Sequence, residues 1–239
     1  MPSLEAYDSS LDYSYAPGVF PSMECLLARP GSVRRLLVHS AAAGREGIGK
    51  LEALAQEHRI RIEEADRALG RISGKENCYA AAVFTKFSDT LRADRPHVVL
   101  HRPGDGGNAG TILRTALGLG MEDVALIRPC VDVFDPRVVR ASMGSFFRLR
   151  VRVYDTFEAY RAEFPERMLY PFMLDASVPL GEIRDVPEAY SLIFGNEGSG
   201  LPPEFAKMGQ AVRIESNDKV DSLNLAVAAA IGIYTFTRM

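Results

Sequence analysis

A short apolar segment that stops at a cluster of glycines constrains this chain more than any other feature. Residues Ser191 to Phe194 have the composition of a buried strand, and Gly195, Gly198 and Gly200 follow directly. Glycine lets a backbone adopt a positive φ or approach a ligand closely. In an open α/β sheet, ligands bind where the strands end. We therefore expect a binding loop here, and a tight strand-to-helix turn without a ligand is the alternative.

The segments around this loop alternate between strand and helix patterns. Beyond residue 96, apolar runs with strand character occupy His97–His101, Val124–Ile127, Leu149–Val153, Leu169–Leu174 and Ala211–Ile214. Helical patterns lie between and after them, over 111–119, 136–143, 156–164 and 222–236. This alternation predicts an α/β fold with a mostly parallel sheet that is covered on both faces.

The first part of the chain has its own organisation. Residues 1–17 show neither period and predict a loose N-terminal arm, whereas 18–87 predict a small α/β unit. The polar segment Phe87–Pro96 has the composition of a linker. We therefore expect two domains, a smaller one over 1–95 and a larger one over 96–239.

Composition limits the cellular setting. The 239 residues are 47% hydrophobic and 25% charged, which allows a substantial core. Cys25, Cys78 and Cys130 are widely spaced, so we expect neither a disulfide framework nor a metal site. The first residues do not form a signal peptide, and no apolar run is long enough to span a bilayer. These features favour a cytoplasmic protein without a membrane or metal partner.

The net charge of −3 does not indicate a nucleic-acid binder, but two local clusters are basic. Arg34 and Arg35 belong to the first, and Arg140 and Arg148 belong to an acid-free stretch over 137–152 that includes Phe146 and Phe147. Arginine pairs with phosphate in a fork geometry, and aromatic rings can stack on bases. The four arginines are our expected RNA contacts. The alternative is a solvated face with core phenylalanines.

Two further stretches carry polar groups at helix starts. A glycine-rich segment over 104–110 precedes a helix that carries Arg114, and a helix N-terminus can hold a phosphate. The next strand runs into Arg128, so the acidic residue of a nicotinamide-binding fold is missing. In the last stretch, Asp221 or Ser222 has the character of an N-cap. The helix is apolar on every face beyond Asn224, which predicts burial in a core or under a partner subunit.

Three of these stretches together resemble the SpoU/TrmH family. They read N-A-G-T-I-L-R-T-A-L-G-L-G at Asn108–Gly120, I-F-G-N-E-G-S-G-L at Ile193–Leu201 and D-S-L-N-L-A-V-A at Asp221–Ala228. The resemblance covers about 96–239. It implies an S-adenosylmethionine-dependent RNA ribose 2′-O-methyltransferase of the SPOUT class, a homodimer whose C-terminal domain contains a deep trefoil knot. Residues 18–87 resemble more loosely the RNA-binding domain that precedes it in many members.

The resemblance also implies roles for individual residues. Matching the motifs assigns the cofactor to backbone groups at Leu174, Gly195, Ile214 and Leu223, with Asn224 nearby. It assigns the polar active-site positions to Asn108, Arg114, Glu197, Ser222 and Asn224. Family members use the residue matched by Arg114 as a proposed base. Because an arginine is effectively always charged, a grip on the phosphate beside the target ribose is the other role.

Several alternatives remain at this point. A non-catalytic RNA-binding module that kept the fold is the runner-up, and the intact polar positions argue against it. A nicotinamide enzyme is disfavoured by the missing acid after Ile127. The motifs do not distinguish ribosomal from transfer RNA, and they do not identify the nucleotide.

Overall fold

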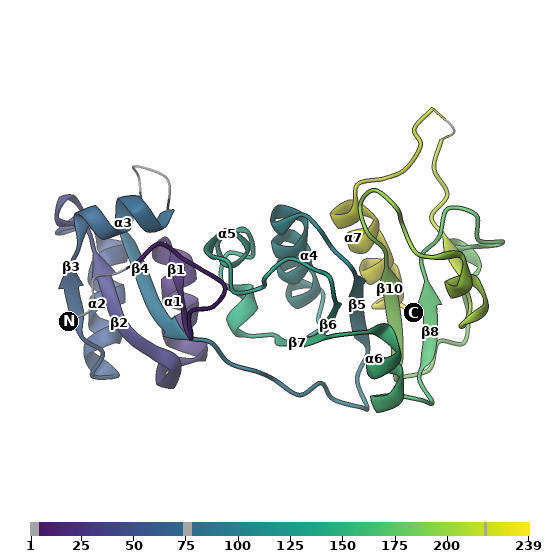
Figure 1. Ribbon diagram of the computed structural model, residues 1–239, viewed down its shortest axis with the longest axis horizontal. Helices are drawn as coiled ribbons and strands as arrows, with labels where there is room; N and C mark the ends of the chain where they lie inside the picture. The colour runs from purple at the N-terminus through teal and green to yellow at the C-terminus, as the bar shows by residue number, and fades with distance from the viewer. Residues whose placement is uncertain (1–4, 74–77, 218) are drawn as a thin grey trace. The chain divides into compact units, whose positions relative to one another are not determined.

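The computed structural model describes residues 5–73, 78–217 and 219–239, and its chain divides into two compact units (Figure 1). The first unit consists of 1–87 with 132–148, and the second of 88–131 with 149–239. This division differs from the expected domains, 1–95 and 96–239, because 132–148 packs with the N-terminal segment. The local sequence pattern of 132–148 does not indicate that this segment packs with the N-terminal residues.

The first unit contains a four-stranded sheet in the order β1-β4-β2-β3. Its strands are β1 (Tyr13–Pro17), β2 (Val33–Val38), β3 (Ile62–Glu64) and β4 (Ala80–Thr85). Only β2 and β3 run parallel. The expected loose arm is therefore wrong over 13–17, which pairs with β4. Four of the five residues of β1 are buried, and a strand buried on both faces has no alternation to detect.

Helices and a phenylalanine cluster complete the first unit. Its helices are α1 (Val19–Ala28), α2 (Glu46–Glu57), α3 (Asp66–Ser73) and α5 (Pro136–Ala141), followed by a short 3₁₀ helix at Ser145–Phe147. The buried ring of Phe147 meets Phe84 edge to face at 4.9 Å between centroids, and Phe146 stacks on Phe87 at 5.2 Å. Phe146 and Phe147 are thus core residues of this unit and are not available to stack on bases.

The second unit is built on a five-stranded, all-parallel sheet in the order β7-β6-β5-β10-β8. The strands are β5 (His97–His101), β6 (Asp123–Ile127), β7 (Arg150–Tyr154), β8 (Met168–Pro171) and β10 (Tyr190–Phe194). A separate parallel pair joins β9 (Val178–Pro179) to β11 (Val212–Arg213). The predicted α/β class with a parallel sheet is confirmed. The trefoil knot stays a prediction, since strand order does not establish threading.

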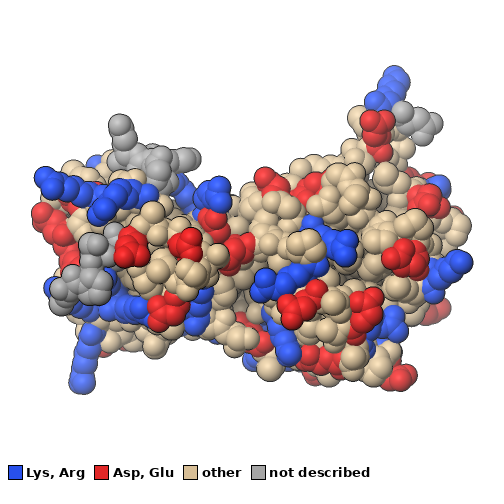
Figure 2. Space-filling model, in the orientation of Figure 1, with Lys and Arg blue, Asp and Glu red and all other residues tan. Residues whose placement is uncertain are grey.

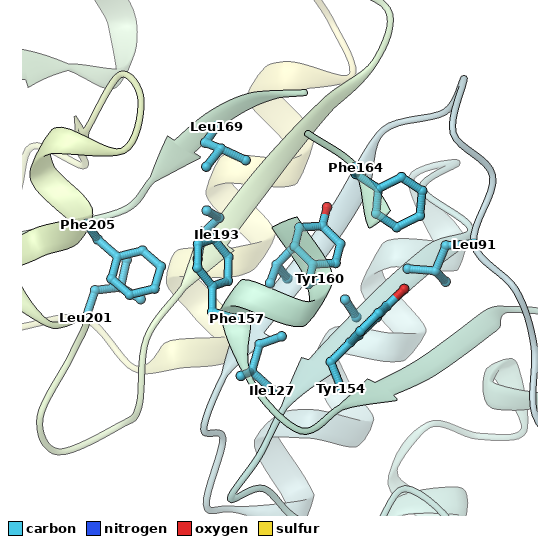
Figure 3. Close-up of a cluster of buried hydrophobic side chains, with 12 residues drawn as sticks. Leu91, Ile127, Tyr154, Phe157, Tyr160, Phe164, Leu169, Ile193, Leu201 and Phe205 are labelled. Carbon is cyan, nitrogen blue, oxygen red and sulfur yellow. The ribbon is translucent and has the colours of Figure 1, made fainter. Parts of the chain in front are cut away.

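Helices cover both faces of this sheet. On one face, α6 (Phe157–Glu163) contributes Phe157 and Tyr160 to a buried cluster with Ile193 of β10 (Figure 3). On the other, α7 (Leu225–Phe236) packs against α4 (Gly106–Gly118) and against β10. A Cβ on Gly232 would lie 2.6 Å from the ring of Phe172 and 3.0 Å from the ring of Phe194 at the end of β10, so α7 rests directly on the sheet.

A buried polar group fixes the segment before β5 to the second unit. The side chain of Asp123 is fully buried and accepts three hydrogen bonds from the Arg92 backbone and guanidinium, at 2.6–2.9 Å. His97 lies between Tyr160 and the Arg92 carbonyl, where burial and then the charge of Arg167 lower its pKa to about 4. The expected linker 87–96 is therefore largely bound to this unit.

No helix within 5–73, 78–217 and 219–239 is long and apolar enough to cross a membrane. In the same ranges, no three His, Cys, Asp or Glu side chains lie together as a metal site would require.

Candidate active site

The loop that follows β10 folds back on itself. Gly195 is buried, and a Cβ there would lie 2.2 Å from the Gly200 carbonyl carbon, so no other residue fits. The Asn196 N–H and carbonyl pair with Gly200 at 3.2 and 2.9 Å. The Asn196 side chain accepts hydrogen bonds from the Gly198 and Ser199 N–H groups and donates to the Arg102 carbonyl at 2.8 Å. The loop is a fixed structure joined to the end of β5.

Glu197 is the centre of a hydrogen-bond network. Its carboxylate accepts hydrogen bonds from the Gly104 N–H at 2.9 Å, the Asp105 N–H at 3.1 Å and the Asn108 amide at 3.2 Å. Partial burial alone would raise the pKa of Glu197, but these donors outweigh it and lower the pKa. Glu197 is therefore a carboxylate at neutral pH, with its oxygens already engaged.

Asn108 and Asn224 extend this network to two helix starts. Asn108 lies in the first turn of α4, where Asp105 is the N-cap and accepts a hydrogen bond from the Asn108 N–H at 2.7 Å. The Asn224 amide donates to the Asn108 side-chain oxygen at 3.0 Å. One connected set of side chains thus links Asn224, Asn108 and Glu197, which come from three separate motifs.

The start of α7 differs from the predicted one. Asn224, and neither Asp221 nor Ser222, is the N-cap, and its side-chain oxygen accepts from the Ala226 and Val227 N–H groups at 2.9 and 3.3 Å. The helix begins at Leu225, three residues later than expected. The prediction of Asp221 or Ser222 as the N-cap is therefore wrong, although asparagine is as good a cap as serine or aspartate.

A pocket of about 210 Å³ lies beside the network. Its walls include the loop backbone from Gly195 to Gly200 and apolar side chains such as Phe172, Phe194 and Leu225. Among the predicted site residues, the structure places Leu174, Gly195, Glu197, Ile214, Ser222 and Leu223 on its lining. Asn224 belongs to the adjoining network instead.

Two predicted polar residues lie outside this network. Ser222 is exposed and lines the pocket without a hydrogen bond to any described residue. Arg114 is exposed on α4, beyond Asn108, and makes no ion pair or hydrogen bond within the described ranges. Its guanidinium is free to meet an anion from outside the protein.

The four arginines expected to contact RNA all belong to the first unit. Arg34 pairs with Asp12 at 2.6 Å and Arg35 with Glu63 at 3.2 Å, while Arg148 pairs with Glu24. Arg140 is half-buried and has no described partner. Figure 2 shows Lys and Arg interspersed with Asp and Glu over the visible face of each unit. Exposed pairs are weak enough to exchange partners.

Sequence reasoning missed two contributors to the site. Asn196 organises the glycine loop, and its place between Gly195 and Gly198 was the available signal, since asparagine side chains often bond to the backbone of a turn. Arg102 supplies a carbonyl to Asn196. The glycine-rich segment also proved shorter than expected, because Gly106 already begins α4 after the Asp105 cap.

Known proteins with similar sequences and structures are RNA methyltransferases by name. An uncharacterised tRNA/rRNA methyltransferase of Synechocystis sp. is 36% identical over 157 residues, 62% of this chain and 56% of that protein. The 23S rRNA (guanosine(2553)-2′-O)-methyltransferase RlmP of Bacillus subtilis is 32% identical over 157 residues, 64% of this chain and 62% of the relative. The chain thus spans less than two thirds of either curated relative.

A solved structure matches nearly the whole fold. The SpoU methyltransferase AviRb from Streptomyces viridochromogenes, in complex with the cofactor AdoMet, aligns with a TM-score of 0.80 and 25% identity. The alignment covers 95% of this chain and 90% of AviRb. Residues 95–234 match the sequence model of the SpoU rRNA Methylase family. This range contains all three motifs and the network that joins them. The chain therefore belongs to the SpoU rRNA methylase family.

Proposed function

We propose that this protein transfers a methyl group from S-adenosylmethionine to a ribose 2′-hydroxyl of ribosomal or transfer RNA. The observation that carries the proposal is the network that joins Asn108, Glu197 and Asn224 beside a pocket lined by a glycine loop. The name of the B. subtilis relative states a 2′-O-methylation of 23S rRNA. We also propose a cytoplasmic location, because ribosomal and transfer RNA, the proposed substrates, are found there.

The chemistry of the pocket fits S-adenosylmethionine. Leu174, Ile214 and Leu223 offer apolar contacts for an adenine ring, and the backbone of Gly195, Gly198 and Gly200 on the pocket wall carries no side chain that would keep a ligand at a distance. These residues would hold the cofactor, which when bound supplies an electrophilic methyl group. Glu197 and Ser222 are among the polar residues that line the same pocket.

The residues around the pocket suggest distinct roles. Glu197 already accepts hydrogen bonds from Gly104, Asp105 and Asn108, so we assign it to positioning and not to proton removal. Arg114 carries a permanent charge and has no described partner. We assign it to the phosphate beside the target ribose, where it also stabilises negative charge that develops on the 2′-oxygen. Correct positioning accounts for much of the rate in such a site.

One experiment tests the proposed reaction. The protein is incubated with radiolabelled S-adenosylmethionine and with purified ribosomal and transfer RNA in separate reactions. We expect label in one RNA class, at a nucleotide that becomes resistant to alkaline cleavage after methylation of its 2′-oxygen. RNA that binds without acquiring label would favour a non-catalytic binding module instead. Label on a base would contradict the ribose assignment.

A homodimer is also proposed, on the basis of α7. The helix was expected to be covered on every face, but Val227 is 48% exposed and Tyr234 is 54% exposed. They are seven residues apart, two turns along one face of α7, and Ile231 lies half-buried between them. A continuous apolar stripe of this kind marks an interaction surface. A second copy of the chain would cover it through the symmetric contact typical of dimers.

RNA contacts in the first unit are the remaining proposal. Arg34 and Arg148 are exposed and form surface ion pairs, which phosphate groups can replace, although Arg34 also donates a hydrogen bond to the Thr85 hydroxyl at 2.8 Å. Arg35 is more enclosed by Glu63, so it would contribute less. Arg140 has no described partner, so a phosphate could bind it without displacing an ion pair.

A further inference from the structure

Arg102 has a backbone conformation that arginine rarely adopts. It directly follows β5, and its φ of 59° lies in the left-handed region. Its N–H donates to the Ile127 carbonyl at 3.1 Å, and its own carbonyl accepts from the Asn196 amide at 2.8 Å. The backbone is thus held from both sides. A left-handed conformation costs free energy for any residue with a Cβ, whereas glycine adopts it freely.

Arg59 provides a comparison within the same chain. It is also left-handed, with a φ of 55°, and it is also exposed. Arg59 directly follows His58, the C-cap of α2, and a left-handed residue is a common way to end a helix. No helix ends at Arg102. Glycine at 102 would make both backbone hydrogen bonds without the cost, so the side chain is the part of Arg102 that glycine could not replace.

The side chain of Arg102 is exposed and uncommitted. It makes no hydrogen bond or ion pair with any residue in 5–73, 78–217 or 219–239. At the end of the adjacent strand β6, Arg128 pairs with Asp155 at 3.2 Å. Two residues after Arg102, the Gly104 N–H donates to Glu197. The residue that carries this free guanidinium therefore lies at the carboxyl end of the sheet, two residues before a backbone donor of the Glu197 network.

We propose that Arg102 binds a phosphate of the RNA substrate next to the target ribose, as a second contact beside that of Arg114. This inference rests on the proposed function. Guanidinium groups match phosphate oxygens in a two-point geometry. Neither Arg102 nor Arg114 lines the pocket assigned to the cofactor, so the phosphate comes from the RNA. The strained backbone sets the direction of the side chain, and the hydrogen bonds with Ile127 and Asn196 hold the backbone of Arg102 in place.

The test compares Arg102→Gly and Arg102→Asn with Arg59→Gly. Asparagine tolerates the left-handed region and carries no charge, so Arg102→Asn removes the charge and keeps the backbone conformation. Arg59→Gly is the control, because it removes an arginine charge and a left-handed backbone strain at a position outside the site. Affinity for ribosomal and transfer RNA is measured by filter binding over a range of salt concentrations. Both Arg102 variants should bind the substrate RNA roughly tenfold more weakly, with a salt slope smaller by about one. Their affinity for S-adenosylmethionine and their melting temperature should not fall.

Three results would overturn the proposal. They are unchanged RNA affinity and salt slope in both Arg102 variants, an equal loss in Arg59→Gly, and a loss of S-adenosylmethionine affinity in place of RNA affinity. Methylation by the wild-type protein is measured in parallel. If it transfers no methyl group while Arg102 still governs RNA affinity, the proposed reaction fails and the phosphate contact stands.

Discussion

Replacing Glu197 by glutamine tests whether its charge holds the active site together. The two carboxylate oxygens accept hydrogen bonds from Gly104, Asp105 and Asn108 at 2.9, 3.1 and 3.2 Å. Glutamine keeps one oxygen and turns an NH₂ group toward donors that need an acceptor. The variant therefore loses one or two charge-assisted bonds and brings two donors face to face.

The size of the effect follows from these bonds. A hydrogen bond to a charged group contributes about 1.5–3 kcal/mol, and the half-buried position of Glu197 favours the lower values. A loss of about 2–4 kcal/mol is expected, which corresponds to roughly 5–12 °C in melting temperature for a chain of this size. The affinity for S-adenosylmethionine should fall as well, because the same loop lines the pocket.

The pH dependence gives the prediction a distinct signature. The pKa of Glu197 is lowered in the folded protein, so the unfolded chain binds this proton more readily. Its stabilisation is therefore complete above the ordinary glutamate pKa of about 4.3 and is lost as the pH falls through the lower folded pKa. The gap in melting temperature between wild type and Glu197→Gln should be constant from about pH 8 to 5 and should narrow below about pH 4.

Differential scanning calorimetry across this pH range is the assay, and Glu204→Gln is the matched control. Glu204 is exposed on the short 3₁₀ helix at Pro203–Lys207 and makes no hydrogen bond or ion pair with a described residue. Its substitution should shift the melting temperature by less than about 1 °C. A Glu197→Gln protein that melts with the wild type at pH 7, or a gap that persists unchanged at low pH, would refute the reasoning.

Three further substitutions test other parts of the site. Gly195→Ala should cost at least about 2 kcal/mol and abolish cofactor binding, because the new Cβ would lie 2.2 Å from the Gly200 carbonyl carbon; Gly198→Ala, whose Cβ would come no closer than 3.5 Å to Asn196, should melt near the wild type. Arg114→Ala should lower single-turnover methylation about a hundredfold or more while cofactor affinity is kept, and Arg114→Lys should restore little of it; near wild-type turnover would remove Arg114 from the catalytic residues. Tyr234→Glu should convert the dimer to monomer in sedimentation, whereas Phe20→Glu, a 69% exposed residue of the first unit, should leave it intact; a wild-type monomer would contradict the dimer itself.

Local patterns predicted the second unit well where one signal dominated. The strand at His97–His101 matches β5 at both ends, because it is a continuous apolar run between Pro96 and Arg102. The start of α4 was missed by five residues, since Gly106, Gly107 and Gly110 indicated a loop. The Asp105 cap and burial against α7 outweigh the weak helix propensity of these glycines.

The pairing of distant segments was beyond sequence reasoning. The stretch 132–148 was expected to continue the larger domain, yet α5 contacts β1 and Phe147 packs on Phe84. The network among Asn108, Glu197 and Asn224 is equally non-local. The family resemblance identified its members as polar site residues, but it did not indicate that they bond to one another.

The network shows how one asparagine links the start of α4 to the pocket proposed to hold the cofactor. The Asn224 oxygen caps α7, and its amide holds Asn108 at the start of α4. Asn108 in turn holds Glu197, which belongs to the loop that lines the pocket. Because α4 also carries Arg114, the arginine proposed to bind phosphate and the pocket wall share one hydrogen-bonded frame. Small displacements of a reacting group cost large factors in rate. A frame of short side chains, each bonded to a helix start or a loop backbone, limits such displacements more than a long flexible residue would.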